Sequence, residues 1–165
     1  MPPTIYISND LYNIICLLFS SDLIHGRAML CFIVMKAPMK QDKQDGNSKQ
    51  YIVKSSWAHI GQSNTEEEML NWIKERGLTY GVPNLIVAWM VQIGGVDNST
   101  DLCWPDYIQS HLSEDQWPEV QVQHWILLNP VGMPLESFSC IQELLSVLID
   151  IIDGKYHSCY ASQGC

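Results

Sequence analysis

Three apolar segments in the middle of the chain have the composition of strands. Residues 51 to 54, YIVK, are short and β-prone, and predict a strand that carries a lysine. Residues 85 to 93, LIVAWMVQI, form a nearly continuous apolar run, which predicts a strand buried on both faces or nearly so. Residues 124 to 128, HWILL, predict a third strand. The prolines and glycine of residues 129 to 135, NPVGMPL, then end it.

A helix is predicted between the first two of these strands. Asn64 is the predicted N-cap, because Glu67 follows three residues later as in a capping box. Glu66, Glu67 and Glu68 fill the first turn, where the helix dipole favours negative charge. Gly77 is the predicted C-terminal cap. These features predict a helix that begins just after the lysine-bearing strand.

A second helix is predicted from about residue 140 to residue 153. Ser139 is its predicted cap, with Gln142 three residues on. Its apolar residues recur at helical spacing. They are Ile141, Leu144, Leu145, Leu148, Ile149 and Ile152. A face this apolar must pack on something.

The remaining segments have weaker patterns. Residues 1 to 50 predict an irregular region or a degenerate first hairpin, and end in a polar stretch that reads as a loop. Residues 94 to 121 are acidic, with prolines and glycines, and predict a surface insertion. Residues 154 to 165 have no pattern and predict an unstructured tail. One helix among several strands, followed by a break and a second helix, predicts an α+β fold.

Composition narrows the range of partners. The 165 residues hold 9 Lys and Arg against 18 Asp and Glu, a net charge of −9. Such a chain repels phosphate backbones and anionic lipid heads, so we expect neither nucleic acid nor a membrane as partner. The six cysteines form no C-x-x-C pair, which argues against a zinc ribbon or a thioredoxin-like motif. Free thiols and the lack of a basic leader predict an intracellular, cytoplasmic protein.

Candidate chemistry centres on Lys54. A strand lysine, a helix glutamate and two strands ending in a Pro/Gly break follow the order of a protein-kinase small lobe, where the lysine holds nucleotide phosphates and the glutamate holds the lysine. Glu66 is the preferred partner, because Met69 and Leu70 follow it at +3 and +4 as in that family. Glu67 is the second choice. The alternative is a snorkelling edge-strand lysine and a merely solvated first turn.

Five segments taken together resemble the fungal-type protein kinase family. They are YIVKSSW, TEEEMLNWI, GVPNLIVAWMVQIGGVDNSTD, SHLSEDQW and LLNPVGMPLESFSCIQELLSVLIDIID, within residues 51 to 153. The resemblance implies a small lobe over residues 51 to 135, made of an antiparallel sheet plus one helix. It also implies a hinge, and a first large-lobe helix within residues 136 to 153. The implied activity is that of an ATP-dependent Ser/Thr-type protein kinase.

The resemblance also implies a nucleotide site. Lys54 would contact the phosphates and Glu66 would hold Lys54. Ile52 would roof the adenine, and Leu127 or Leu128 would lie at the back of the pocket. Residues 129 to 131 would offer hinge backbone groups to the adenine edge. The implied ATP-binding residues are Lys54, Glu66, Ile52, Leu128, Asn129 and Val131.

The sequence departs from the family in two places. Residues 23 to 35, LIHGRAMLCFIVM, stand where a glycine-rich loop is expected but hold one glycine, Gly26, so an ordinary first hairpin is expected there. No H-R-D catalytic loop or metal-binding aspartate motif follows, and Asp150 and Asp153 within the helix cannot replace them. We therefore expect no catalytic residue, no Mg²⁺ site and no activity from this chain alone.

Two other readings stay open. The chain could be a pseudokinase-like or interaction module, which uses the exposed apolar helix 140 to 153 to bind a protein partner or a second copy of itself. It could also be part of a working kinase whose remainder lies outside the 165 residues.

Overall fold

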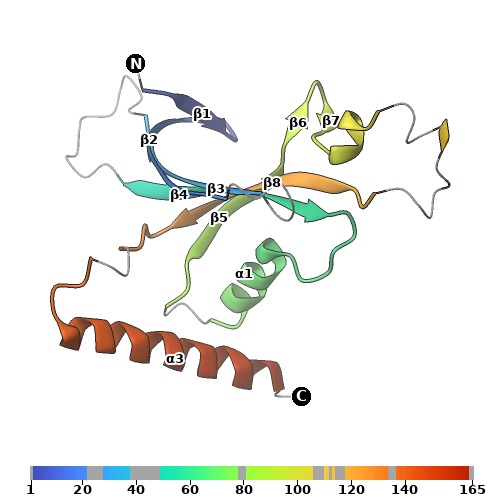
Figure 1. Cartoon of the computed structure of the whole chain (residues 1–165). Helices are drawn as coiled ribbons and strands as arrows, with labels where there is room; N and C mark the ends of the chain where they lie inside the picture. The colour runs from blue at the N-terminus through green and yellow to red at the C-terminus, as the bar shows by residue number, and fades with distance from the viewer. Residues whose placement is uncertain are drawn as a thin grey trace.

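The computed structural model shows an α+β fold, as predicted: a curled antiparallel sheet with helices α1 and α3 beside it (Figure 1). It describes residues 2–21, 28–37, 49–77, 81–105, 110–111, 113, 118–133 and 137–163, the last eleven as backbone alone. The six-stranded sheet has the order β1-β2-β3-β4-β8-β5. Its strands are β1 (Thr4–Ile7), β2 (Asp10–Ser20), β3 (Met29–Lys36), β4 (Gln50–His59), β5 (Asn84–Met90) and β8 (Gln121–Asn129).

The remaining elements attach to this sheet or flank it. They are helix α1 (Glu66–Glu75), a two-stranded sheet of β6 (Gln92–Ile93) and β7 (Val96–Asp97), the 3-10 helix η1 (Thr100–Cys103), and helix α3 (Ile141–Gln163). This arrangement is compatible with a kinase-like small lobe: an antiparallel sheet, with α1 between β4 and β5 along the chain, and an irregular segment after β8.

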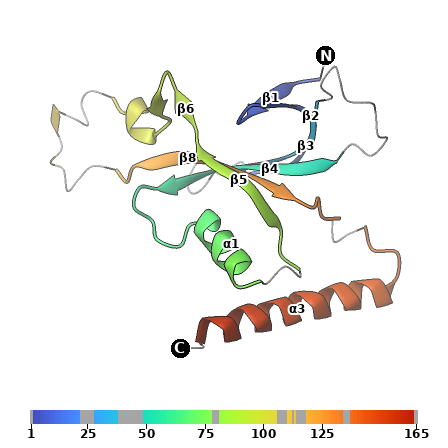
Figure 2. The ribbon, with the colours of Figure 1, turned by 180° about the vertical axis from the view of Figure 1, so that it is seen from behind.

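The two faces of the sheet bury different clusters. On one face, β1 and the start of β2 curl over the sheet (Figures 1 and 2) and enclose Val34, Val53 and Leu127, of which no side chain is more than 1% exposed. On the other face, α1 covers a smaller cluster of Leu70, Leu85, Ile126 and Leu128. Because side chains alternate along a strand, β4 turns Val53 to the first face and its neighbours to the second.

The first fifty residues are more regular than expected. Where an irregular region or a degenerate first hairpin was expected, β1, β2 and β3 form antiparallel strands, and the hairpin is present as β2–β3. The β2–β3 register shifts between Ile14 and Cys16 and again between Leu17 and Phe19. Each bulge reverses the inward and outward alternation, so this strand has no period of two in the sequence.

The apolar run at 85 to 93 is not a strand buried on both faces. β5 lies at the sheet edge, pairs only with β8 among the described strands and ends at Met90. Ile86 is 45% exposed and Met90 48% exposed. The chain then forms the β6–β7 hairpin, which turns at Gly94 and Gly95. An edge position explains why so apolar a strand is only half covered.

Helix α1 begins one residue later than predicted. Thr65, not Asn64, is the N-cap, and Glu68, not Glu67, completes the capping box. The Thr65 Oγ1 accepts from the Glu68 backbone N at 3.2 Å, and the Thr65 backbone N donates to Glu68 Oε2 at 2.8 Å. Asn64 has φ +60°, a left-handed turn just ahead of the cap. Gly77, at φ +72°, follows the C-cap, so the predicted helix end is confirmed within one residue.

The start of the predicted insertion is tied to the sheet. The Asn98 side chain donates to Gln123 Oε1 at 2.7 Å, and the Gln123 amide donates to Ser55 Oγ at 2.9 Å. Ser99, which is 8% exposed, bridges Val122 of β8. These bonds attach the β6–β7 region to the centre of β4 and β8.

Helix α3 is longer than predicted and starts differently. It continues to Gln163, so the prediction of an unstructured tail is wrong for residues 154–163. One glycine, Gly154, costs a helix only about 1 kcal/mol relative to alanine and does not end it. At its start, Ser139 contacts Glu143 rather than Gln142: its backbone N and Oγ donate to Glu143 Oε2 at 2.7 and 2.6 Å.

Candidate functional site

Lys54 and Glu66 form an ion pair between the sheet and α1. Lys54 Nζ contacts Glu66 Oε2, across twelve residues of chain. The Lys54 side chain is 22% exposed and that of Glu66 is 38% exposed. The glutamate preferred from the sequence is thus the one that reaches the lysine, although α1 is capped differently from the prediction.

Local structure explains this pairing. Val53 and Ser55, on either side of Lys54, are 0% and 3% exposed on the opposite face of β4, which fixes the lysine on the α1 face. The Thr65 capping box fixes the start of α1 and occupies Glu68. Glu66, the first helical residue, is then free to reach β4. A half-exposed pair of this kind adds about 1 kcal/mol or less to stability, so its main effect is to orient the ammonium.

The ion pair borders a notch of about 290 Å³ between α1 and the middle of the sheet. Its walls combine apolar side chains with hydroxyl, amide and carboxylate groups. The lining residues are Met29, Lys54, Ser56, Trp57, Ala58, Gln62, Thr65, Glu66, Glu67, His124 and Ile126. The notch therefore offers one cation, Lys54, within a partly apolar recess.

Cys31 lies beside this ion pair, as the β3 partner of Lys54. Burial is the largest influence and raises the pKa of the Cys31 thiol, Lys54 lowers it, and Glu66 raises it again. The net upward direction keeps Cys31 a neutral thiol at neutral pH. Cys31 thus resembles an apolar wall residue more than a nucleophile.

The predicted adenine-side residues lie further along the same face. Ile52 shares the α1 face of β4 with Lys54 and is the cross-strand partner of Leu128. Leu128 is 6% exposed and belongs to the α1-side cluster, with Ile52 packed against it. Leu127 is 1% exposed in the opposite cluster. Of the two leucines considered from the sequence, Leu128 is therefore the one on the face of Lys54.

The predicted hinge begins where β8 ends. Asn129, 8% exposed, is the last residue of β8 and the partner of Asn84. Val131 is half-buried just after the strand. Neither residue lines the notch, so the six predicted residues divide into an ion pair at the notch and an apolar and hinge group toward the end of β8.

The stretch predicted to replace a glycine-rich loop is only partly described. His25 and Gly26 lie outside the described residues. Residues from Met29 onward form β3, and Met29 lines the notch. Their role at a phosphate site stays a prediction.

Sequence reasoning missed several residues of the notch. Met29 and Ile126 line the notch because β3, β4 and β8 align across the sheet, where Met29 is the partner of Ser56 and Ile126 the partner of Lys54. His124 lines the notch as the partner of Ser56. Only the strand register brings these residues together, and nothing in their spacing along the chain indicates it.

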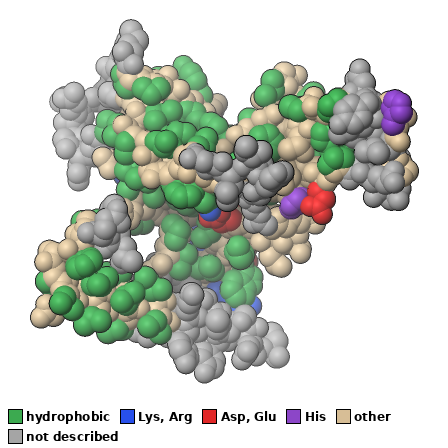
Figure 3. Space-filling view, in the orientation of Figure 1, with side chains coloured by type: hydrophobic (Ala, Val, Ile, Leu, Met, Phe, Trp, Pro, Cys, Tyr) green, Lys and Arg blue, Asp and Glu red, His purple; other side chains and the backbone are tan. Residues whose placement is uncertain are grey.

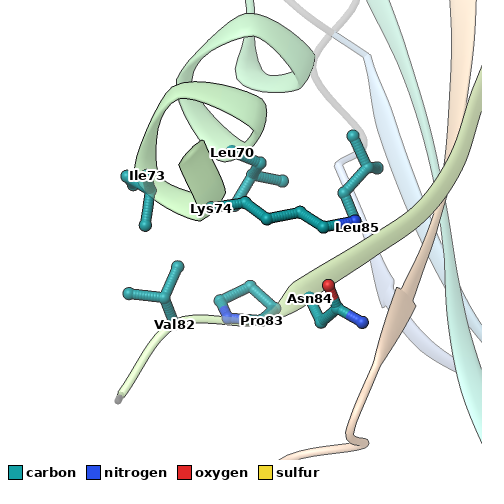
Figure 4. Close-up of a pocket in the computed structure, with 7 residues that line it drawn as sticks. All are labelled: Leu70, Ile73, Lys74, Val82, Pro83, Asn84 and Leu85. Carbon is teal, nitrogen blue, oxygen red and sulfur yellow. The ribbon is translucent and has the colours of Figure 1, made fainter. Parts of the chain in front are cut away.

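A second recess, of about 70 Å³, lies between α1 and the start of β5 (Figure 4). Leu70, Ile73 and Lys74 of α1 face Val82 and the residues that follow it. Ligand pockets are about 300 Å³ or larger, so this recess is a packing gap between helix and strand.

The described residues contain neither a metal-binding cluster nor a membrane-spanning helix. Within the described part of the chain, no group of three or more His, Cys, Asp or Glu residues could hold a metal ion. No helix among the described residues has the length and apolar character needed to cross a membrane.

Comparison with known proteins identifies the family. No curated protein and no solved structure matches the chain. The family model described as fungal protein kinase matches residues 3–164. This match extends beyond the segments 51 to 153 and includes both the first strands and the C-terminal half of α3. The chain therefore belongs to the fungal protein kinase family.

Proposed function

We propose that this chain is the nucleotide-binding portion of an ATP-dependent, Ser/Thr-type protein kinase domain, and that Lys54 contacts the nucleotide phosphates. The observation that carries the proposal is the ion pair between Lys54 Nζ and Glu66 Oε2. The chain carries a net charge of −9, so a phosphate needs a local positive group to bind. The partly buried Lys54 ammonium, oriented by the Glu66 carboxylate, supplies one.

The residues present fit the phosphate end of a nucleotide. Lysine is a compact cation with three donors, suited to phosphate oxygens as a point charge. Ser56, Gln62 and Thr65 line the same notch with polar groups. At about 290 Å³, the notch is near the lower limit for ligand pockets, so it suits the phosphates rather than the whole nucleotide.

The adenine would lie toward the end of β8. Ile52 is on the face of Lys54 two residues earlier and only half-buried, so it offers apolar surface to a flat ring. Asn129 ends β8 as the partner of Asn84, and residues 130 and 131 follow beyond the end of the strand. Leu128 supports Ile52 from across the strand pair.

We propose that these residues bind nucleotide without transferring phosphate. Phosphoryl transfer depends on a base that orients the acceptor hydroxyl and on aspartates that hold Mg²⁺. The 165 residues contain no H-R-D sequence. Lys54, Glu66 and the adenine-side residues could position ATP, and the remaining chemistry would have to come from groups beyond them.

The test is a thermal melt of the chain with and without ATP, each with and without Mg²⁺. A ligand at 100 times its Kd stabilises the native state by about 2.7 kcal/mol, which for a domain of this size raises Tm by roughly 5 to 10 °C. Lys54→Met should abolish the rise. Lys74→Met is the matched control, because Lys74 is an α1 lysine outside the notch.

Two results would overturn the proposal. One is a cooperative melt with no shift at millimolar ATP. The other is a shift that Lys54→Met and Lys74→Met reduce equally, which would indicate nonspecific attraction of an anion to lysines.

A further inference from the structure

The notch beside α1 contains a histidine with no partner. His124 of β8 lines the notch and is half-buried. Within the part of the chain that the structure describes, no hydrogen bond or ion pair engages its ring, and neither ring nitrogen is sealed from solvent. An imidazole donates at least one N–H in either protonation state. The notch therefore offers an unused donor in addition to Lys54.

The charges at the notch call for such a donor. Glu66 and Glu67 line it together with Lys54, so two carboxylates face one ammonium and leave an excess negative charge. Of the described residues that line the notch, only Lys54 and His124 have side chains that can be positive. Figure 3 shows that described Lys and Arg side chains occupy little of the face that it displays. A polyphosphate in this notch would be repelled by the carboxylates unless a second group binds it.

The register of β4 and β8 places His124 beyond Lys54 as counted from the predicted hinge. Three successive cross-strand pairs lie on the α1 face: Ile52 with Leu128, Lys54 with Ile126, and Ser56 with His124. Antiparallel strands rise about 3.4 Å per residue, so neighbouring pairs on one face are roughly 7 Å apart. With the adenine at the first pair and the inner phosphates at the second, the outer end of a polyphosphate reaches the third.

Lys54 and His124 are close enough to bind one phosphate chain together. They are diagonal neighbours across the β4–β8 pair. Such neighbours are about 7 to 8 Å apart, within reach of long side chains. A phosphate chain that contacts the Lys54 ammonium can therefore extend to the His124 ring.

We propose that His124 binds the terminal phosphate of the nucleotide and gives the site a preference for a triphosphate over a diphosphate. This inference rests on the proposed nucleotide site. Lys54 contacts the inner phosphates, which ATP and ADP share, whereas His124 donates an N–H to an oxygen of the third phosphate. Ser56, its partner on β4, brings a hydroxyl to the same end of the notch. Loss of the His124 ring should therefore affect the triphosphate alone.

Titration calorimetry with ATP and with ADP, both without Mg²⁺, tests the proposal. The unchanged chain should bind ATP roughly tenfold more tightly than ADP, which is the contribution expected of one hydrogen bond to a charged group. His124→Leu removes the ring donors and keeps a side chain of similar size. It should remove the preference by weakening ATP binding, and leave ADP binding unchanged.

Three further variants serve as controls. His124→Gln keeps an N–H donor and should retain part of the ATP preference. His59→Leu removes a histidine at the end of β4 that lies 3.1 Å from Glu119 and outside the notch, so both affinities should stay unchanged. Lys54→Met should weaken ATP and ADP binding alike, because both nucleotides carry the inner phosphates.

A measurement on the unchanged chain applies even if His124→Leu fails to fold. In a chain with ¹³C-labelled histidine, the NMR signal of the His124 ring is identified by its loss in His124→Gln. This signal should shift when ATP binds, and much less when ADP binds. Equal shifts with the two nucleotides, or no shift with bound ATP, would overturn the proposal.

The outcomes separate this inference from the proposed function. If neither nucleotide binds, both fail. If ATP and ADP bind equally and His124→Leu changes neither affinity, the nucleotide site stands and His124 is no part of it. Equal weakening of ATP and ADP by His124→Leu would also contradict a contact with the terminal phosphate.

Discussion

The side chains of β4 alternate between two faces of the sheet, and the two faces have different environments. Val53 and Ser55 face a cluster in which Val34, Val53 and Leu127 are 1% exposed or less. Ile52 and Lys54 face α1, where the lysine remains 22% exposed and borders a notch. The first face can be filled by any well-shaped apolar side chains, whereas the second must keep a cation oriented and accessible. Substitutions on the first face should therefore mainly lower the free energy of unfolding, and substitutions on the second face should mainly weaken ligand binding.

The largest effect is expected on the filled face. Leu127→Ala should lower the free energy of unfolding by about 2 to 5 kcal/mol, because it leaves a cavity among fully buried neighbours. Urea unfolding measures this change. Ile86→Ala, at an edge-strand position that is 45% exposed, is the control and should cost under about 1 kcal/mol. Equal losses would mean that the Leu127 side is not the principal core.

Lys54→Met should show the opposite behaviour on the site face. Because the Lys54–Glu66 pair is partly exposed, its loss should change unfolding free energy by about 1 kcal/mol or less. The same variant should remove the whole ATP-dependent rise in Tm. A variant that instead unfolds the chain would show that the ion pair is structural, and the contrast between the two faces would fail.

Some elements of the fold and of the candidate site could be predicted from the sequence, and others could not. The strand 51 to 54 and the helix start were predictable, because β-prone residues and three glutamates at a helix start are local signals. The choice of Glu66 among the three glutamates depended on the family pattern, in which apolar residues follow the glutamate at +3 and +4. The first hairpin was obscured by bulges in β2 near Ile15 and Leu18. The notch residues Met29 and Ile126 depend on strand register, which arises from the whole sheet rather than from residue spacing.

Thr65→Ala should have a moderate effect between these two extremes. Loss of an N-cap side chain costs about 0.5 to 2 kcal/mol, and α1 carries both Glu66 and the Leu70 that covers the second cluster. Asn64→Gly is the control, because glycine accepts the φ of +60° found there and should cost a few tenths of a kcal/mol. Chemical unfolding compares the two, and a larger loss at Asn64 would restore the cap first predicted from the sequence.

The smallest effect is expected from the choice between adjacent glutamates, and it tests the site face most finely. Both Glu66 and Glu67 line the notch, but only Glu66 contacts Lys54. Glu66→Gln should leave folding almost unchanged, yet weaken ATP binding several-fold, because the neutral amide orients the ammonium less firmly. Glu67→Gln removes the same charge beside the phosphate region and should leave ATP binding equal or slightly tighter. Titration calorimetry measures the ATP affinity of both variants. It distinguishes the effect of orienting the Lys54 ammonium from the effect of removing a negative charge. If both substitutions tighten binding alike, Glu66 acts only as a repulsive carboxylate and does not position Lys54.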